Sequence, residues 1–224
     1  MGAQEPFVSP GAAGRTPLRP DDGRLQRGRR SRARIREAAR ALFRERGFDA
    51  TTLRAIAQRA GMGASSLYRH IRTKEELLVD ELQELQEQAW HQFRRRRVSR
   101  GGPETASERL RRFLDAEHQL LARDPDLTTI ALRATTHPEA RVAGQVLALQ
   151  DRTVGLLAEI MLQGRSRGEL RRGVDVLAAA RTIAHTTNGA RIAWANGQLD
   201  GEACRRAIDT AVDVLFQGIG APPG

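Results

Sequence analysis

Cysteine is almost absent from this chain of 224 residues, in which Cys204 is the single example. One thiol excludes an internal disulfide, and it excludes a metal cluster held by several thiolates. The histidines lack the close spacing of metal-ligand pairs, so we expect no metal site and no cofactor. Cys204 lies on an apolar stripe and is expected to be a small core residue.

Long hydrophobic runs are also missing, since no apolar stretch reaches 18 residues. We therefore expect no membrane-spanning helix. The N-terminal residues lack the apolar centre of a secretory signal, so we expect a cytoplasmic protein. Aromatic residues make up only 4% of the chain, which leaves Leu, Ala, Val and Ile to form a core of packed helices.

Strand patterns and the usual catalytic patterns are absent as well. No segment alternates apolar and polar residues with a period of two, so the expected fold class is all-α. The chain has no Walker loop, no nucleophile elbow and no pair of carboxylates at a defined spacing. We therefore expect that the protein is not an enzyme.

Negative charge is scarce at one end of the chain. Residues 1–80 carry 17 basic and 9 acidic groups, whereas residues 81–224 carry 20 and 18. A basic excess confined to one end indicates a polyanionic partner. Lys74 is the single lysine, and so strong a bias toward arginine is typical of coding bias. The arginine content alone therefore indicates no function.

Residues 1–30 are rich in proline and glycine and show no apolar period, so we expect a disordered, basic N-terminal extension. A basic run from Arg24 to Arg36 crosses the end of this extension. Two interpretations of the run remain open. It is either a solvated tail or an arm that reaches the phosphates or minor groove of DNA.

Residues 31–78 predict three short helices and the start of a fourth. Apolar residues recur at helical spacing over 31–46. Thr51 or Thr52 is placed to cap a second helix, and a glycine turn at 61–63 separates that helix from a third over 64–71. This layout is typical of a helix-turn-helix domain that binds duplex DNA.

The third helix has the two faces that a DNA-reading helix needs. Leu67 and Ile71 are its predicted core anchors. Its opposite face carries small or hydrogen-bonding side chains: Ala64, Ser65, Ser66, Tyr68, Arg69 and His70. Arg69 could reach a guanine edge. Lys74 places a cation at a helix N-terminus, against the helix dipole, so stability does not explain it. A bound phosphate would explain it, and a solvated lysine is the alternative.

The segment from Ile35 to Leu78 resembles the N-terminal domain of the TetR (tetracycline repressor-like) family of transcriptional regulators. The resembling residues are AA…LF…GF…TTL…IA…AG, followed by SSLYRHI.TKEELL. The resemblance implies phosphate contacts for Thr52, Tyr68, His70 and Lys74, and a major-groove position for Ala64, Ser65, Ser66 and Arg69. Gly63 departs from the family, which usually has Ser or Thr there. Glycine can cap the helix but offers no hydroxyl to a phosphate.

Residues 79–220 also have helical patterns, which gives about nine helices in all. The resemblance implies that this part binds a ligand and dimerises. The last two helices, about 174–196 and 202–218, carry more small and apolar residues than one protein layer needs. We therefore expect them to form a four-helix bundle in a homodimer, whose two-fold symmetry would match a palindromic operator.

Polar residues lie within the apolar arcs of three helices in this part of the chain. A carboxylate such as Glu117 in an apolar stripe is costly unless it has a partner. We expect these helices to line a pocket for an unknown small molecule. The expected ligand-binding residues are Phe113, Glu117, His118, Gln150, Thr153, Thr187 and Arg191. The alternative is that Glu117 and Arg191 form a buried structural pair.

These features predict a transcriptional regulator of duplex DNA, a repressor that leaves a palindromic operator when a small-molecule ligand binds. Two alternatives remain open. A structural DNA-binding protein would need no effector, and a ligand-responsive activator would have the same sequence features. The sequence does not identify the effector or the operator.

Overall fold

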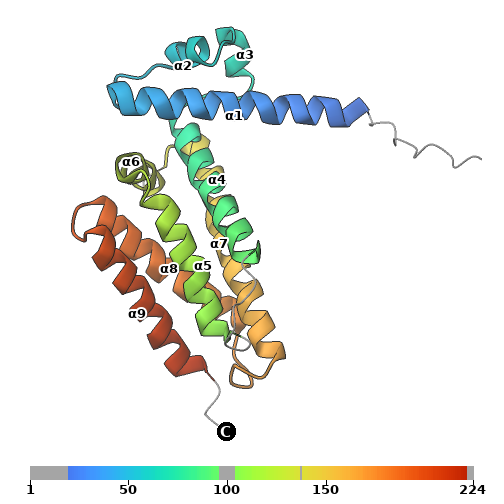
Figure 1. Cartoon of the computed structure of the whole chain (residues 1–224), viewed down its shortest axis with the longest axis vertical. Coiled ribbons are helices and arrows are strands. Elements are labelled where there is room, and N and C mark those ends of the chain that lie inside the picture. The colour runs from blue at the N-terminus through green and yellow to red at the C-terminus, as the bar shows by residue number, and fades with distance from the viewer. Residues whose placement is uncertain (1–19, 96–103, 137, 221–224) are drawn as a thin grey trace, which may run out of the picture.

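The computed structural model of the chain describes residues 20–95, 104–136 and 138–220. Nine helices and no strands form in these ranges, which confirms the all-α fold (Figure 1). They are α1 (Pro20–Arg46), α2 (Leu53–Arg59), α3 (Ala64–Tyr68), α4 (Lys74–Arg95), α5 (Ala106–Leu121), α6 (Pro125–Thr136), α7 (Ala140–Ser166), α8 (Val176–Ala195) and α9 (Gly201–Ile219). No helix in the described ranges is long and apolar enough to span a bilayer.

Helix α1 begins at Pro20, eleven residues before the expected boundary at Ser31. Residues 20–30 are therefore helical, and the expectation of disorder was wrong for them. Proline is well tolerated at the first position of a helix, and arginine is a strong helix former. The expected start at Ser31 was set by the apolar residues that recur from Ile35 onward, where α1 packs on a core. The expected disorder of residues 1–19 lies outside the described residues.

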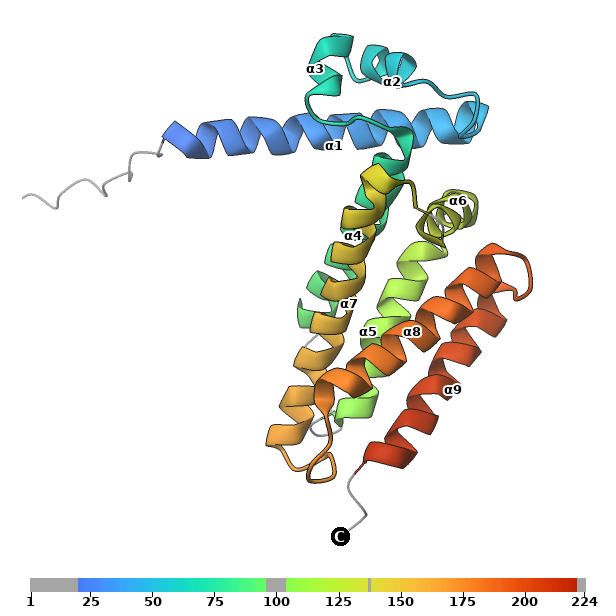
Figure 2. The ribbon, with the colours of Figure 1, turned by 180° about the vertical axis from the view of Figure 1, so that it is seen from behind.

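The N-terminal helices pack around a small apolar core. Ile35 of α1, Ile56 of α2 and Leu67 of α3 are completely buried in it. Helices α2 and α3 lie on one side of α1, and helices α4 to α9 lie on the other (Figures 1 and 2). The same core continues through Leu78 of α4 to Leu127 of α6, so the two parts of the chain share packed side chains.

The remaining helices form a layered bundle. Helix α4 leaves the N-terminal part and packs against α5, α6 and α7, while α8 lies between α7 and α9. Gly164 of α7 allows the start of α5 to approach closely, because a Cβ atom there would lie 2.5 Å from the Cβ of Ala106. Helices α8 and α9 run side by side at one edge of the bundle (Figures 1 and 2). Their outer face therefore faces solvent.

Candidate DNA interface and effector pocket

Helix α3 presents the surface that the sequence predicts. Leu67 is buried beneath it, whereas Tyr68 and Arg69 are exposed on the outside. The other expected contact residues of this helix and of the turn after it are exposed or half-buried: Ala64, Ser65, Ser66 and His70. Arg69 donates a hydrogen bond from Nη2 to the Ser66 hydroxyl at 3.2 Å. The guanidinium is thus held beside the helix and keeps other donors free.

Side-chain caps differ between the two helices of this motif. The Thr52 hydroxyl accepts a hydrogen bond from the Ala55 amide at 3.1 Å, as an N-cap residue should, and the Thr52 side chain is exposed. Gly63 is the N-cap of α3 and makes no side-chain cap bond. Gly63 therefore offers no hydroxyl where the family usually has Ser or Thr, and the first backbone amides of α3 have no capping side chain.

Lys74 has a structural role that the sequence interpretation missed. Its ammonium donates to the carbonyl oxygens of Phe48 at 2.8 Å and Asp49 at 3.3 Å. It also lies over the Phe48 ring, 4.5 Å from the centroid. Stability therefore does explain a cation at this helix end, contrary to the sequence argument. An ammonium has three donors, so one remains for an anion.

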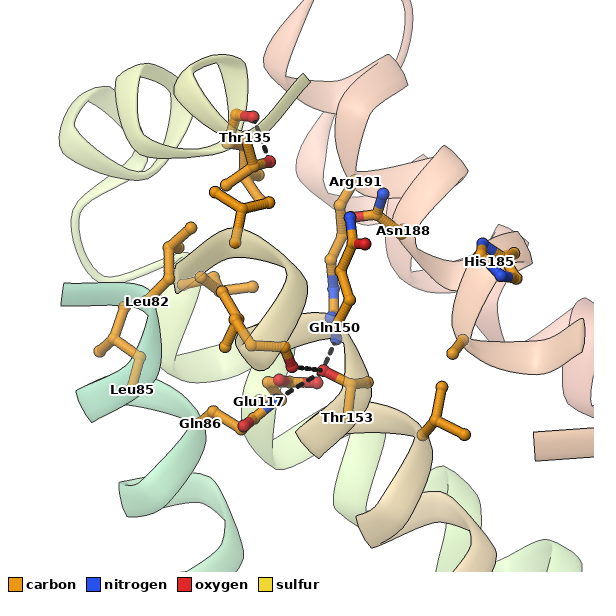
Figure 3. Close-up of a pocket in the computed structure, with 16 residues that line it drawn as sticks. Leu82, Leu85, Gln86, Glu117, Thr135, Gln150, Thr153, His185, Asn188 and Arg191 are labelled. Atoms are coloured by element: carbon orange, nitrogen blue, oxygen red, sulfur yellow. Dashed lines mark hydrogen bonds and ion pairs between the residues drawn. The ribbon is translucent and has the colours of Figure 1, made fainter. Parts of the chain in front are cut away.

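A cavity of about 90 Å³ lies between α4, α5, α6, α7 and α8 (Figure 3). Most of its wall is apolar, with Leu82 and Leu85 of α4 on one side and Leu149 of α7 beside them. The other apolar residues are Leu121, Leu132, Val146, Val154 and Ala184. Exposed side chains of Gln150, His185 and Asn188 also line it, so the cavity reaches solvent between α7 and α8.

One wall of the cavity is polar. The Arg191 Nη2 atom lies 2.6 Å from Glu117 Oε2, and both side chains are less than 10% exposed. The Gln86 amide nitrogen donates to the Thr153 hydroxyl at 2.6 Å. Among the described residues, Gln86 Oε1 and Arg191 Nε are buried and have no hydrogen-bond partner. The buried polar groups of the wall thus offer one unmet acceptor and one unmet donor.

The structure brings four of the expected pocket residues together: Glu117, Gln150, Thr153 and Arg191. Three others do not line the cavity. Phe113 is completely buried against Trp90 and Phe93, with ring centroids 5.4 and 5.8 Å away. Thr187 is buried and donates its hydroxyl proton to the Ala184 carbonyl at 3.1 Å, which satisfies it within α8.

His118 is the third residue that the pocket excludes. Its ring is buried and lies 5.3 Å from the Trp194 ring, on the side of α5 that faces α8 and α9. Burial lowers the pKa of His118, and the nearby positive charge of Arg191 lowers it further. The imidazole is therefore held in its neutral form as a packing residue. Among the described residues no cluster of His, Cys, Asp or Glu could hold a metal ion.

Gln86 is a pocket residue that the sequence interpretation missed although a signal was present. It lies four residues after Leu82 and three before Ala89, so it is a polar residue on the buried stripe of α4. The same criterion identified Glu117 on α5. His185 and Asn188 gave no such signal, because they lie on an exposed face of α8.

Helix α4 connects the cavity to the N-terminal helices. Its residues Leu82, Leu85 and Gln86 line the cavity. On a neighbouring face, its Glu81 carboxylate pairs with Arg40 of α1 at 2.7 Å, and Glu84 pairs with Arg36 at 2.8 Å. A displacement of α4 at the cavity would therefore move the ion-paired α1 as well.

Comparisons with known proteins agree with this arrangement. The model of "Bacterial regulatory proteins, tetR family" matches residues 35–80, and that of the "Tetracyclin repressor-like, C-terminal domain" matches residues 103–213. The transcriptional repressor KstR of Mycolicibacterium smegmatis is 28% identical over 188 residues, which cover 84% of this chain and 88% of that protein. KstR2 of Mycobacterium tuberculosis is 32% identical over 149 residues, which cover 65% of this chain and 64% of KstR2.

A solved structure with a similar fold is that of FadR from Thermus thermophilus, a TetR-family transcriptional repressor in complex with lauroyl-CoA. It has a TM-score of 0.68 and 25% sequence identity, and the match covers 86% of this chain and 97% of FadR. The two family models, the curated relatives and this structure all indicate one family. The chain therefore belongs to the TetR family and is a DNA-binding, ligand-responsive transcriptional repressor rather than an enzyme.

Proposed function

We propose that a homodimer of this chain represses transcription from a palindromic operator and leaves the operator when a small molecule fills the cavity beside α4. The observation that carries the proposal is the double role of α4, which forms one cavity wall and is ion-paired to α1. A ligand that binds one subunit geometry better than another shifts the population toward it. A cavity would serve no purpose in a purely structural DNA-binding protein.

The effector class that we propose is an acyl-CoA thioester. The leucine-lined wall suits an acyl chain, and the unmet groups on Gln86 and Arg191 suit a polar head. The relative from Thermus thermophilus supports this class, because it was solved with lauroyl-CoA. At about 90 Å³ the cavity is smaller than the roughly 300–1,000 Å³ of ligand pockets. An acyl chain must therefore widen the cavity, of which α4 forms one wall.

The proposal is tested by selecting bound duplexes from a random pool and then titrating the complex with lauroyl-CoA. We expect the selected duplexes to be palindromic and lauroyl-CoA to release them, while free CoA does not. A selected duplex that stays bound at saturating lauroyl-CoA would contradict the effector class. A protein that binds none of the duplexes at low salt would contradict the DNA-binding function itself.

Replacing Leu149 with tryptophan should prevent lauroyl-CoA from binding in the cavity. Leu149 lines the cavity, so a larger side chain there occupies the space that the acyl chain needs. We expect lauroyl-CoA no longer to release the operator from this variant. Leu147→Trp is the matched control, since Leu147 lies two residues away on the exposed face of α7. If lauroyl-CoA releases the operator equally from both variants, the cavity is not its binding site.

On the DNA side, we propose that Ala64, Ser65, Ser66 and Arg69 face the major groove. Arg69→Ala should then lose discrimination at one base pair of the half-site, worth about 1–3 kcal/mol. Operators with single base-pair changes measure this directly, because discrimination at the other positions should remain. A uniform loss across all positions would instead assign Arg69 to the DNA backbone. We propose backbone contacts for Thr52, Tyr68, His70 and the remaining donor of Lys74.

We further propose that α8 and α9 form the dimer interface. Leu177 and Val214 are 47% and 62% exposed on these helices, and the small residue Gly189 is exposed on α8 as well. A four-helix bundle with a second copy would bury this face. A repressor of bacterial transcription acts on the chromosome, so we propose the cytoplasm as its location.

A further inference from the structure

The N-terminal half of α1 is not part of the DNA-binding surface described above. It extends past α3 as a single helix, away from the rest of the molecule (Figures 1 and 2). Residues 26, 27, 29 and 30 are exposed. Residues 23–36 contain seven arginines and no acidic residue. Arginines three and four residues apart on a helix repel one another, so this composition is unfavourable unless an anion lies nearby.

The arginines of this segment divide between two faces of the helix. Arg34 donates hydrogen bonds to the carbonyl oxygens of Ala60 and Gly61, at the turn between α2 and α3. Arg30 and Arg27 precede Arg34 by four and seven residues, so they share its face. This face therefore points to the side of α1 on which α2 and α3 lie.

The second arginine face points toward α4. Arg36 pairs with Glu84 at 2.8 Å, and the positive charge of Arg32 is close enough to act on the Asp80 carboxyl. Arg29 lies three residues before Arg32 and seven before Arg36, which places it on that face too. The two faces thus carry similar charge but point in nearly opposite directions.

The face toward α3 carries one carboxylate, Glu37, which lies seven residues after Arg30 and makes no ion pair among the described residues. Arg27 and Arg30 make no ion pair among the described residues, and Arg27 donates only to the backbone carbonyl of Gly23 at 3.1 Å. From Arg34 to Arg27 the helix rises about 10 Å. A row of exposed guanidinium groups of this length fits a line of phosphates along a nucleic-acid strand.

We propose that Arg27, Arg30 and Arg34 form a second DNA contact, which binds backbone phosphates flanking the base pairs read by α3. The inference rests on the proposed function, because it requires a duplex docked on α3. The contact is independent of sequence, since phosphates are the same at every base pair. It would increase operator affinity and its salt dependence without changing which bases are preferred.

The test compares R27A/R30A with R29A/R32A, two variants that each lose two positive charges from the same helix. Alanine is a strong helix former, so α1 should persist in both, as circular dichroism can verify. Operator affinity is measured between 50 and 200 mM salt on a long duplex and on one trimmed to the base pairs beneath α3. Over roughly this range of salt concentration, affinity falls steeply with the number of phosphate contacts, so a lost contact is measurable.

On the long duplex, R27A/R30A should flatten the slope of log K against log salt by about two for each protomer. R29A/R32A should leave that slope close to the wild-type value, and the difference should disappear on the trimmed duplex. Equal slopes for both variants, or no change in R27A/R30A, would overturn the second contact while leaving the proposed function intact. Failure of the wild-type protein to bind any duplex would instead overturn the proposed function.

Discussion

Glu117→Ala will lower the free energy of unfolding by about 3–5 kcal/mol, because it leaves the Arg191 guanidinium buried without its carboxylate. The two groups are 2.6 Å apart, and their side chains are 6% and 8% exposed. A buried cation with no partner carries the full cost of its lost hydration. Arg191 Nε already lacks a hydrogen-bond partner among the described residues, so loss of Glu117 adds to the unmet donors of the guanidinium. Urea denaturation of the wild type and the variant measures the difference.

The double variant E117L/R191M separates loss of the charge pair from loss of packing. It removes both charges and keeps side chains of similar volume, so most of the stability should return. Recovery would show that the single variant suffers from the unpaired guanidinium. If Glu117→Ala costs less than 1 kcal/mol, water must hydrate Arg191 through the cavity, and the ion pair would not be a structural element of the wall.

The fold could be predicted from the sequence where helices have one apolar face. Ile35 and the residues at helical spacing after it place the anchored part of α1. The start of α2 could be placed at Thr51 or Thr52, of which Thr52 is the cap, and Gly63 marks the start of α3. The start of α1 could not be placed, because the described side chains before Ser31 are exposed or half-buried and show no apolar period. A method based on apolar period detects only the part of a helix that packs.

The lining of the cavity was predictable only in part, because a polar residue on an apolar helix face either lines a cavity or is hydrogen-bonded within its own helix. A polar residue on an apolar face lines a cavity at Glu117 and Thr153, but it is satisfied within its own helix at Thr187. His118 follows Glu117 directly, about 100° around the helix, and this rotation turns it toward Trp194 instead of the cavity. The packing of α4, α5, α6, α7 and α8 against one another decides which side chains meet, and the sequence of one helix does not carry that information.

Val214→Arg should dissociate the proposed dimer and lower operator affinity by a factor of 100 or more. Val214 is 62% exposed on α9, on the face that we assign to the four-helix bundle. An arginine at this position would bury one unpaired charge per protomer in an apolar interface. A monomer binds one half-site, and it loses the factor of roughly 10²–10⁴ that linking two binding modules provides.

Analytical ultracentrifugation measures the assembly, and titration of the selected duplex measures the affinity. Leu162→Arg is the matched control, because Leu162 is an exposed leucine of α7 that lies outside α8 and α9. This variant should remain dimeric and bind the operator as the wild type does. A Val214→Arg protein that stays dimeric and binds normally would show that two copies meet through another surface. The α8–α9 face would then need a different partner to account for its exposed apolar side chains.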